Sequence, residues 1–465
     1  MMKKRLAVFT LVAVSVLSFA WAGYFLYDWS WGADYHLRAA EQAMQQRDFI
    51  EAKTHIAWCL NARPNKPEVQ LLAARIDRRS IFPLLPGGVD GPGACLTAGS
   101  VRYDGSYYEV EEHLAKYAEL GGLTELLNLE QNLLRAQAGA LNMLVQDGTT
   151  GHTVEQMLQS WIKENHPDSA LILEALVKAY LQSYRLAEAL QCLNTWLTRQ
   201  EDIQALLWRA WILARLNDDA GALKDYQRVL VLAPENDKVR QRVAEMLLRL
   251  SGPAAAVEQF DLLRRRQVSN PALTLGWAQC RKALGAPDES RQLIDGLLAE
   301  HPDYIPALIE RGKLALEEGQ MDEAERLFRS AVQRAPHDAL ANYNLYLCLQ
   351  GRGKKEEARA LAVQRAQIEK DMNRMDELGR AVALKPHDAS LRCEAGTILL
   401  RNGLKDDGLR WLGSALREDP YHTPTHSALA EYYEKEGNHP LAAFHRRIAA
   451  EAAINVSPSS ATEKP

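Results

Sequence analysis

Four histidines near the carboxyl end of the chain are the residues with the clearest capacity for chemistry. His422 and His426 are four positions apart, His439 and His445 follow them, and Glu431 lies between the two pairs. Imidazole and carboxylate groups that converge can bind zinc. A histidine at a helix end can instead hydrogen-bond the terminal carbonyl groups. Because other histidines of the chain also stand next to prolines at segment junctions, the capping role is the favoured interpretation.

Cysteine is the second residue type with chemical potential, and the six cysteines are scattered along the chain without a CxxC pair. They are Cys59, Cys95, Cys192, Cys280, Cys348 and Cys393. Most stand at positions compatible with the apolar face of a helix, so buried and unpaired thiols are expected. An oxidising compartment would permit pairing, but the spacing defines no disulfide framework.

Sequence motifs for nucleotide binding and catalysis are missing. The chain has no GxxxxGK[ST], no HExxH and no GxSxG, and no GxGxxG follows a strand pattern. The glycine-rich stretch at residues 87–99 lacks the strand and helix that a phosphate-binding loop needs, so a flexible insert is expected there. We therefore predict no cofactor, no metal and no enzymatic activity.

The elements that must position any site are helices. The 465 residues are 47% hydrophobic and 25% charged, which excludes a disordered chain and a polytopic membrane protein. The net charge of −5 gives no overall basic field, so nucleic acid is not an expected partner. Length alone suggests about three domains at ~150 residues each.

A period of 34 residues replaces that three-domain estimate. Successive units begin at Ile203, Asp237, Pro271, Ile305 and Ala339. Small residues recur at positions 8 and 20 of these units, and proline ends most of them. In the unit that begins at Ile305, Gly319 and Pro336 delimit two helices, at about residues 306–318 and 321–334. The small residues would let the two helices of a unit approach closely.

This pattern resembles the tetratricopeptide repeat (TPR) family, whose helix–turn–helix unit has small residues at positions 8, 20 and 27 and proline at 32. The matching residues in the best unit are Gly312, Ala324, Ala331 and Pro336. Arg209 and Arg311 depart from the family pattern at position 7, where an apolar residue is usual. The resemblance extends over roughly residues 33–450 and implies an all-α fold, a right-handed α-solenoid of TPR repeats.

One transmembrane helix is expected before this solenoid. Lys3, Lys4 and Arg5 precede residues 6–27, which carry no charge. As a helix this segment would be about 33 Å long, enough for a ~30 Å hydrocarbon core, and the basic residues would stay cytoplasmic. We expect a single-pass signal-anchor in a bacterial cytoplasmic membrane, with the bulk of the chain outside the cytoplasm. Cleavage near Ala22, in an A-x-A pattern, and secretion are the alternative.

Three interruptions of the repeat pattern, at residues 81–104, 146–152 and 373–388, define the expected domain layout. The segments are a cytoplasmic basic tip at 1–5, the membrane segment at 6–27, TPR-like helices at 33–80, a Gly/Pro-rich insert at 81–104, degenerate TPR-like helices at 105–169, a TPR array at 170–372, an insert or helix extension at 373–388, a C-terminal TPR pair at 389–450 and a disordered tail at 455–465. Residues 356–384 are either one long helix or two helices with a bend near Asn373.

The resemblance also implies a binding surface. In TPR proteins the first helices line a concave groove, through positions 2, 5, 9, 12 and 13. The groove candidates in this frame are Trp211, Arg215, Lys313, Glu317, Tyr343, Leu347, Thr397 and Arg401. Their aromatic, aliphatic and charged character suits an extended peptide or a partner helix. The oligomeric state is not defined by the sequence.

The function that these features favour is a membrane-tethered scaffold or adaptor, which binds a protein partner on the outer side of a bacterial cytoplasmic membrane. The resemblance implies a role in envelope, secretion or polysaccharide assembly. Two alternatives are an exported enzyme subunit, built on the 81–104 insert or the C-terminal histidines, and a carbohydrate-binding solenoid.

Overall fold

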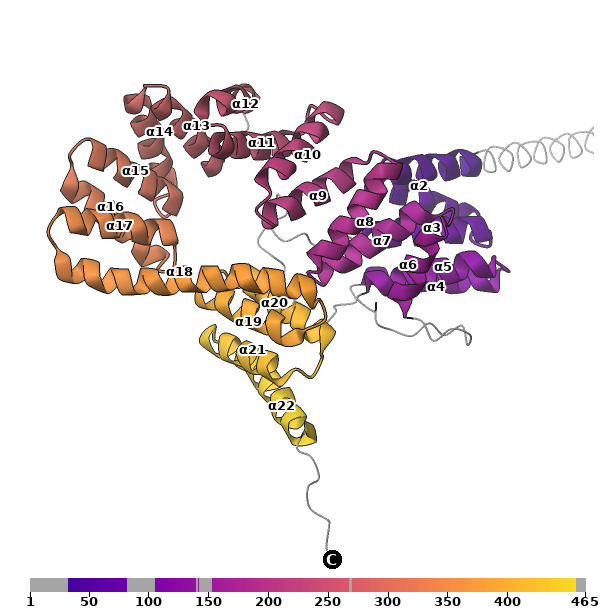
Figure 1. Ribbon diagram of the computed structural model, residues 1–465. Helices are drawn as coiled ribbons and strands as arrows, with labels where there is room; N and C mark the ends of the chain where they lie inside the picture. Colours follow the sequence, from indigo (N-terminus) through magenta and orange to yellow (C-terminus); the bar gives the residue numbers. More distant parts are fainter. Residues whose placement is uncertain (1–31, 82–104, 139–140, 142–152, 267–269, 457–465) are drawn as a thin grey trace, which may run out of the picture. The chain divides into compact units, whose positions relative to one another are not determined.

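The computed structural model describes residues 32–81, 105–138, 141, 153–266 and 270–456 (Figure 1). These residues form helices joined by turns, and no strand occurs among them. The expected membrane segment at 6–27 and nearly all of the 81–104 insert lie outside the described residues. Within the described ranges, no helix combines the length and the apolar character needed to cross a membrane.

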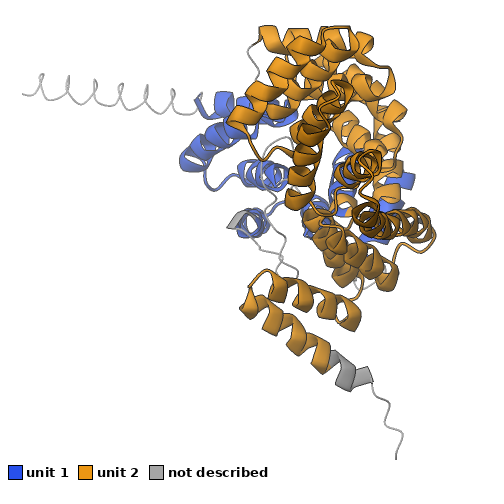
Figure 2. Ribbon diagram, turned by 90° about the vertical axis from the view of Figure 1, so that its left-hand side faces the viewer, with its two compact units in different colours: residues 1–83, 100–179 blue, residues 84–99, 180–465 orange. Residues whose placement is uncertain are grey.

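The chain divides into two compact units, shown in different colours in Figure 2. Unit 1 contains residues 1–83 and 100–179. Its helices are a segment at 32–45, α2 (Phe49–Ala62), α3 (Pro67–Ser80), α4 (Gly105–Glu119), α5 (Thr124–Gln137), α6 (Val154–Lys163) and most of α7 (Ser169–Gln182). Two apolar clusters form its core, one around Ile56 and Ile76 and the other around Leu114 and Leu134.

Unit 2 contains residues 84–99 and 180–465. Its helices are α8 (Leu186–Arg199), α9 (Ile203–Arg215), α10 (Asp219–Leu232), α11 (Asp237–Leu250), α12 (Pro253–Arg265), α13 (Pro271–Ala283), α14 (Pro287–Glu300), α15 (Ile305–Glu317), α16 (Met321–Arg334), α17 (Ala339–Gly351), α18 (Lys355–Leu384), α19 (Ala389–Arg401), α20 (Lys405–Glu418), α21 (Thr423–Lys435) and α22 (His439–Val456). Its core is a series of apolar clusters, in which consecutive helix pairs pack on each other, as in solenoid proteins.

Small residues set the distance between the two helices of a pair. A Cβ atom on Gly312 in α15 would lie 2.5 Å from Cε1 of Phe328 in α16, closer than real Cβ atoms come to other atoms. Phe328 is fully buried, so it cannot move aside into solvent. The small residue at position 8 of this repeat is therefore needed because an aromatic ring packs against the helix backbone there. A similar close approach occurs between repeats: a Cβ atom on Gly276, at position 6 of its repeat on α13, would lie 2.5 Å from the ring of Phe260 in the preceding helix α12.

The turn between paired helices uses one backbone conformation in most repeats. Position 15 has a positive φ in the repeats that carry glycine there: Gly285, Gly319, Gly353, Gly403 and Gly437, with φ between 73° and 87°. Arg47 and Tyr184 adopt the same left-handed conformation, with φ of 62° and 53°. A left-handed residue with a side chain costs roughly 1–2 kcal/mol, and both of these side chains make contacts distant in sequence, described below.

The long helix α18 answers the question left open by the sequence. It runs without a break for 30 residues from Lys355 to Leu384. Asn373 lies in the interior of this continuous helix. No atom lies within 4 Å of the position that a Cβ atom on Gly379 would occupy, so this glycine is not needed for close packing against a neighbouring helix. The last half of α18 packs on α19 through Leu378 and Val382.

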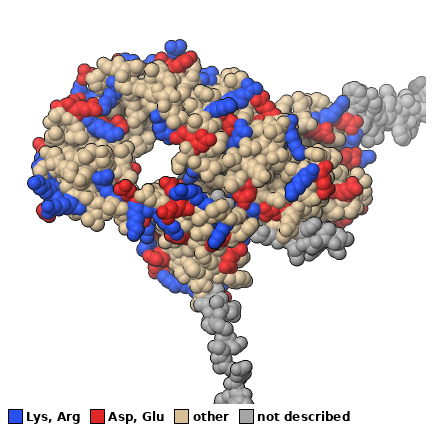
Figure 3. Space-filling model, in the orientation of Figure 1, with Lys and Arg blue, Asp and Glu red and all other residues tan. Residues whose placement is uncertain are grey.

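The first and last parts of unit 2 pack against each other. Tyr184, just after α7, contacts the ring of Trp411 in α20, with ring centroids 4.8 Å apart. These two residues share an apolar cluster with Leu378 of α18 and Ile398 of α19. The array of unit 2 is thus closed by contacts between residues more than 200 positions apart, and an opening is visible within this unit in Figure 3.

Candidate interaction surfaces

An exposed apolar pair on α17 is the clearest surface for a partner. Tyr343 and Leu347 are one helical turn apart, and they remain 44% and 41% exposed. The guanidinium carbon of Arg365, from α18, lies 4.9 Å from the ring centroid of Tyr343 and 4.9 Å from that of Tyr346. A cation held over aromatic faces keeps its N–H groups directed to the side. This arrangement offers an apolar contact and a positive charge side by side.

The surface depression between α18 and α19 contains two further groove candidates. It has a volume of about 870 Å³ and includes Thr397, Arg401, Lys370 and Asp371 in its lining. Arg401 is half exposed and donates two hydrogen bonds to Asp371, at 2.9 and 2.6 Å. Thr397 donates to the carbonyl oxygen of Cys393 at 2.9 Å.

The Asp371 carboxylate accepts hydrogen bonds from three side chains in or beside this depression. Burial alone would raise the pKa of its carboxyl, but hydrogen bonds from Arg401, Asn402 and Gln367 hold that pKa below its ordinary value. Asp371 therefore stays ionised and fixes the position of Arg401. The structure assigns this carboxylate to positioning of the arginine.

Lys313 and Glu317, on α15, are engaged in surface ion pairs. Lys313 Nζ lies 2.8 Å from Glu310 Oε1, and Glu317 Oε1 lies 2.6 Å from Nζ of Lys282 in the preceding repeat. Exposed ion pairs of this kind contribute little stability, typically 0–1 kcal/mol. Both side chains could therefore exchange their partners for a ligand at low cost.

Trp211 and Arg215, on α9, lie in the intramolecular contact that closes unit 2. Trp211 packs against the cluster of Tyr184 and Trp411, and the Arg215 guanidinium lies 5.2 Å from a Trp211 ring centroid. Arg215 Nη1 is 2.9 Å from Asp407 Oδ1 of α20. Substitution of Trp211 would therefore disturb this packing, whether or not the residue also meets a partner.

Two arginines, one buried and one partly buried, complete the closing contact. Arg392, fully buried on α19, donates at 3.0 Å to the carbonyl oxygen of Ser183 and at 3.1 Å to Ser414 Oγ. Arg417, on α20, donates to the carbonyl oxygen of Gln182. Burial and the nearby charge of Arg392 lower the pKa of Arg417 to about 10. Both cations face the carboxyl end of α7, where the helix dipole favours positive charge.

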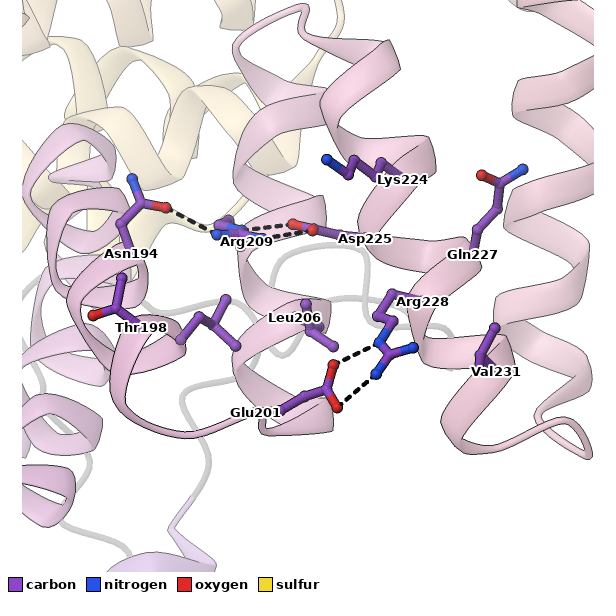
Figure 4. Close-up of a pocket in the computed structure, with 11 residues that line it drawn as sticks. Asn194, Thr198, Glu201, Leu206, Arg209, Lys224, Asp225, Gln227, Arg228 and Val231 are labelled. Atoms are coloured by element: carbon purple, nitrogen blue, oxygen red, sulfur yellow. Dashed lines mark hydrogen bonds and ion pairs between the residues drawn. The ribbon is translucent and has the colours of Figure 1, made fainter.

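A second depression lies between α8, α9 and α10 and has a volume of about 640 Å³ (Figure 4). Its apolar lining includes Leu206 and Val231, and two ion pairs, Arg209–Asp225 and Arg228–Glu201, also line it. Arg209 makes two hydrogen bonds of 2.7 Å to Asp225. Arg209 also donates to Asn194 of α8 at 3.1 Å, which explains an arginine at position 7 of this repeat.

Arg311, the other arginine at position 7, lies three repeats further on and also contacts the preceding second helix. Its Nε donates to Asp295 of α14 at 2.8 Å. In both cases the arginine links its own first helix to the preceding second helix. At Arg311 the departure from the family pattern places an ion pair between neighbouring repeats, whereas at Arg209 the ion pair with Asp225 lies within one repeat and the link to α8 is the hydrogen bond to Asn194.

Two of the C-terminal histidines form a buried pair. His426 and His445 are buried, with their Nδ1 atoms 2.9 Å apart, and His426 Nε2 lies 2.9 Å from the carbonyl oxygen of Pro420. His422 is hydrogen-bonded to Thr425 and lies 3.1 Å from Ser390. Within the part of the chain that the structure describes, no three histidine, cysteine or acidic side chains are grouped in a way that could hold a metal.

Four cysteines are buried free thiols, as the sequence predicted: Cys59, Cys280, Cys348 and Cys393. Burial raises the pKa of Cys280 to about 11, and burial raises the pKa values of the other three as well. A thiol with a raised pKa is a poor nucleophile, because the thiolate is the reactive form. Cys95 lies outside the described residues.

Arg365 belongs to the α17 surface, but the repeat frame did not select it. It stands at position 27 of the unit that begins at Ala339, on a second helix, whereas groove residues are expected on first helices. The sequence could have pointed to this residue, because an arginine stands at position 27, where the family pattern has a small residue.

Comparisons with known proteins support the repeat architecture. Tetratricopeptide repeat models match residues 174–237 and 315–372. A Sinorhizobium fredii protein described as uncharacterized, y4yS, is 32% identical over 125 residues, which cover 26% of this chain and 65% of that protein. The chain thus spans slightly less than two thirds of this relative.

Solved structures of similar chains include a repeat protein and a pilus biogenesis factor. A tetratricopeptide repeat protein from Parabacteroides merdae matches 57% of this chain and 93% of its own, at 21% identity and a TM-score of 0.41. PilW, a type IV pilus biogenesis factor, matches 42% of this chain and 91% of its own, at 20% identity and a TM-score of 0.35. The two family-model matches establish that this chain contains TPR repeats, and the helical repeats described above have the corresponding architecture.

Proposed function

We propose that the protein is a non-catalytic interaction scaffold whose partner binds along α17, α18 and α19. The observation that carries this proposal is the exposed pair Tyr343 and Leu347, with Arg365 over the tyrosine ring. Large apolar side chains that stay exposed side by side mark interaction sites more often than isolated ones. Tyrosine and arginine are also enriched among the residues that dominate binding energy.

The partner segment that suits this surface combines an apolar side chain with a carboxylate. The apolar group would pack on Tyr343 and Leu347, and the carboxylate would accept hydrogen bonds from Arg365. The depression that contains Thr397 and Arg401 extends the surface along α18 and α19. Of the remaining groove candidates, Lys313 and Glu317 would contact a longer ligand, whereas Trp211 and Arg215 take part in the contact that closes unit 2.

Site-specific crosslinking in membranes and extracts of the source cells tests the proposal. A photoreactive phenylalanine analogue would replace Tyr343 in the full-length chain and, as a matched control, Tyr421, which is 71% exposed on a turn. We expect a defined adduct from position 343 and none from position 421. Leu347→Ala should weaken that adduct, whereas the control Leu384→Ala, at an 84% exposed position, should not. Equal adducts at both tyrosines would refute this choice of surface.

We also propose that residues 6–27 tether the scaffold to a bacterial cytoplasmic membrane, with the repeats on its outer side and a role in envelope, secretion or polysaccharide assembly. The support is the uncharged run behind Lys3, Lys4 and Arg5. Carbonate extraction should leave the full-length chain in the membrane fraction, and protease added to spheroplasts should digest the repeats. A mature amino terminus just after Ala22 would replace the tether by an exported soluble protein.

A further inference from the structure

Unit 1 contains a buried cluster of charges that the proposed scaffold function does not use. Two carboxylates, Glu130 of α5 and Glu174 of α7, lie at its centre, and both are almost completely buried. Five cations surround them: Arg47 from the turn before α2, Arg75, Arg78 and Arg79 from α3, and Lys178 from α7. We call these seven residues the basic cluster.

Glu174 joins three of the cations. Its Oε2 atom lies 3.2 Å from Arg47 Nη2 and 3.0 Å from Arg79 Nη2, and its Oε1 atom lies 3.2 Å from Lys178 Nζ. Burial would raise the pKa of Glu174, but these cations, led by Lys178, hold it well below its ordinary value. Arg47 reaches this carboxylate from the strained left-handed turn position noted above.

Glu130 joins the other two cations. Arg75 Nε and Arg78 Nε donate to its two oxygens at 2.7 and 2.8 Å. Both bonds use the Nε atoms, so the Nη1 and Nη2 groups of Arg78 point elsewhere. Arg78 has no exposed surface, and neither of its Nη atoms has a hydrogen-bond partner among the described residues.

Other buried polar atoms of α3 and α5 are also unsatisfied. Arg79 Nε and both amide atoms of Gln137 have no partner within the described part of unit 1. Gln137 follows Glu130 by seven residues, which places both side chains on one face of α5. Leu134, on the turn between them, packs with Ala74 of α3, so this region of α5 faces α3.

The ion pairs of the basic cluster leave positive charge uncompensated. Five cations meet two carboxylates, and the pKa of Lys178 is lowered to about 8, first by its burial and further by the charges of Arg78 and Arg47. Buried N–H groups of a charged side chain that have no acceptor, as at the Nη atoms of Arg78 within the described residues, are costly in a protein interior. An anion next to Arg78 would supply both the missing charge and the missing acceptor.

We propose that unit 1 binds a small inorganic anion, of the size and charge of chloride, at the Nη groups of Arg78. The ligand must be small because the guanidinium is fully enclosed by protein. The amide nitrogen of Gln137 and Nε of Arg79 are further buried donors of unit 1 that lack a partner among the described residues. The anion stabilises α3 and thereby the packing of α3 against α5 and α7.

Bromide provides a direct test, because it replaces chloride and scatters anomalously. Crystals of the full-length protein grown in sodium bromide should show an anomalous peak within hydrogen-bond distance of the Arg78 Nη atoms. The absence of this anomalous peak, or an ordered water molecule at its expected position, would overturn the proposal. This test needs no substitution and is independent of any effect on folding.

Hydrogen exchange provides the test in solution. In the wild-type chain, replacing gluconate by chloride at constant ionic strength should slow amide exchange of residues 67–80 about tenfold when chloride is at ten times its Kd. Arg78→Lys should remove this dependence, whereas the control Arg326→Lys, on the exposed surface of α16, should keep it. A chloride effect of equal size in Arg78→Lys, or no effect in wild type, would contradict the assignment.

Discussion

Acid should selectively loosen the last repeat, α21 and α22, because His445 is buried in its neutral form. His445 has no exposed surface, and its Nδ1 lies 2.9 Å from Nδ1 of His426. Since His426 Nε2 faces the Pro420 carbonyl oxygen, the proton between the two rings belongs to His445 Nδ1. A further proton on His445 would be buried beside a ring that has no negative charge.

The magnitude follows from the pKa of His445. Burial, with a smaller contribution from His426, lowers this pKa from 6.5 to about 4. The unfolded chain therefore binds a proton more tightly than the folded chain does. The last repeat keeps its full stability above pH 6.5 and loses it progressively as the pH falls toward 4. The total loss is about 3 kcal/mol, at 1.36 kcal/mol for each pKa unit.

Hydrogen exchange of residues 423–451, corrected for the intrinsic pH dependence of exchange, measures this loss. Between pH 7 and pH 4.5 the opening free energy should fall by about 2.5 kcal/mol through His445 alone, roughly 70-fold in the open fraction. His445→Asn supplies the comparison, because its amide can still donate to His426 Nδ1 but does not titrate. This variant should be less stable at pH 7 and much less sensitive to acid.

Exposed groups also titrate in this range, so the difference between the two proteins is the decisive quantity. The pairs Glu434–Arg446 and Glu434–His439 are present in both, and their acid response cancels in the comparison. His301→Asn, at an exposed histidine of unit 2, controls for the loss of one titrating side chain. If wild type and His445→Asn lose the same protection between pH 7 and 4.5, the assignment of a buried neutral histidine is wrong.

Three further substitutions test the packing of unit 2 by urea denaturation. Gly312→Ala should lower the free energy of unfolding by about 1–2 kcal/mol, because its Cβ atom would lie 2.5 Å from Phe328. The control Gly296→Ala, which has no neighbouring atom within 4 Å, should raise the free energy of unfolding by up to about 1 kcal/mol. A gain of stability in both variants would refute the close approach of Gly312 and Phe328. Arg392→Met should cost about 2–4 kcal/mol, since the Ser183 and Pro386 carbonyl oxygens lose their buried donors, and unchanged stability would show that the closing contact is dispensable. Asp202→Ala should cost about 1 kcal/mol, because its carboxylate caps α9 through the amide groups of Gln204 and Ala205; no change would show that this cap is not formed.

The sequence was most informative where the interactions are local. The positions of glycine at the turns and of small residues at the seams follow from contacts within one repeat, and these recur every 34 residues. The repeat frame could thus predict which helices pair and which faces they bury. It could also nominate Tyr343 and Leu347, because a first-helix position determines its orientation within the repeat.

The sequence was least informative where distant repeats meet. Arg392 donates to the carbonyl oxygen of Ser183, 209 residues earlier in the chain, and Arg215 pairs with Asp407. No periodic pattern records which repeats come together after many small rotations along an array. Trp211 and Arg215 hold groove positions by their number in the repeat, but they contact α18 and α20 because unit 2 closes there.

By itself, the sequence determined that this chain is helical, that it repeats, and which side chains fill the seam of each helix pair, since those properties depend on residues fewer than 34 positions apart. The tertiary structure decided what the exceptional residues do. Arg47 and Tyr184 occupy turn positions where glycine is usual, and their roles are visible only through Glu174 and Trp411. The reason is physical: burial and the pairing of charges are set by neighbours in space, and those neighbours are distant in the sequence.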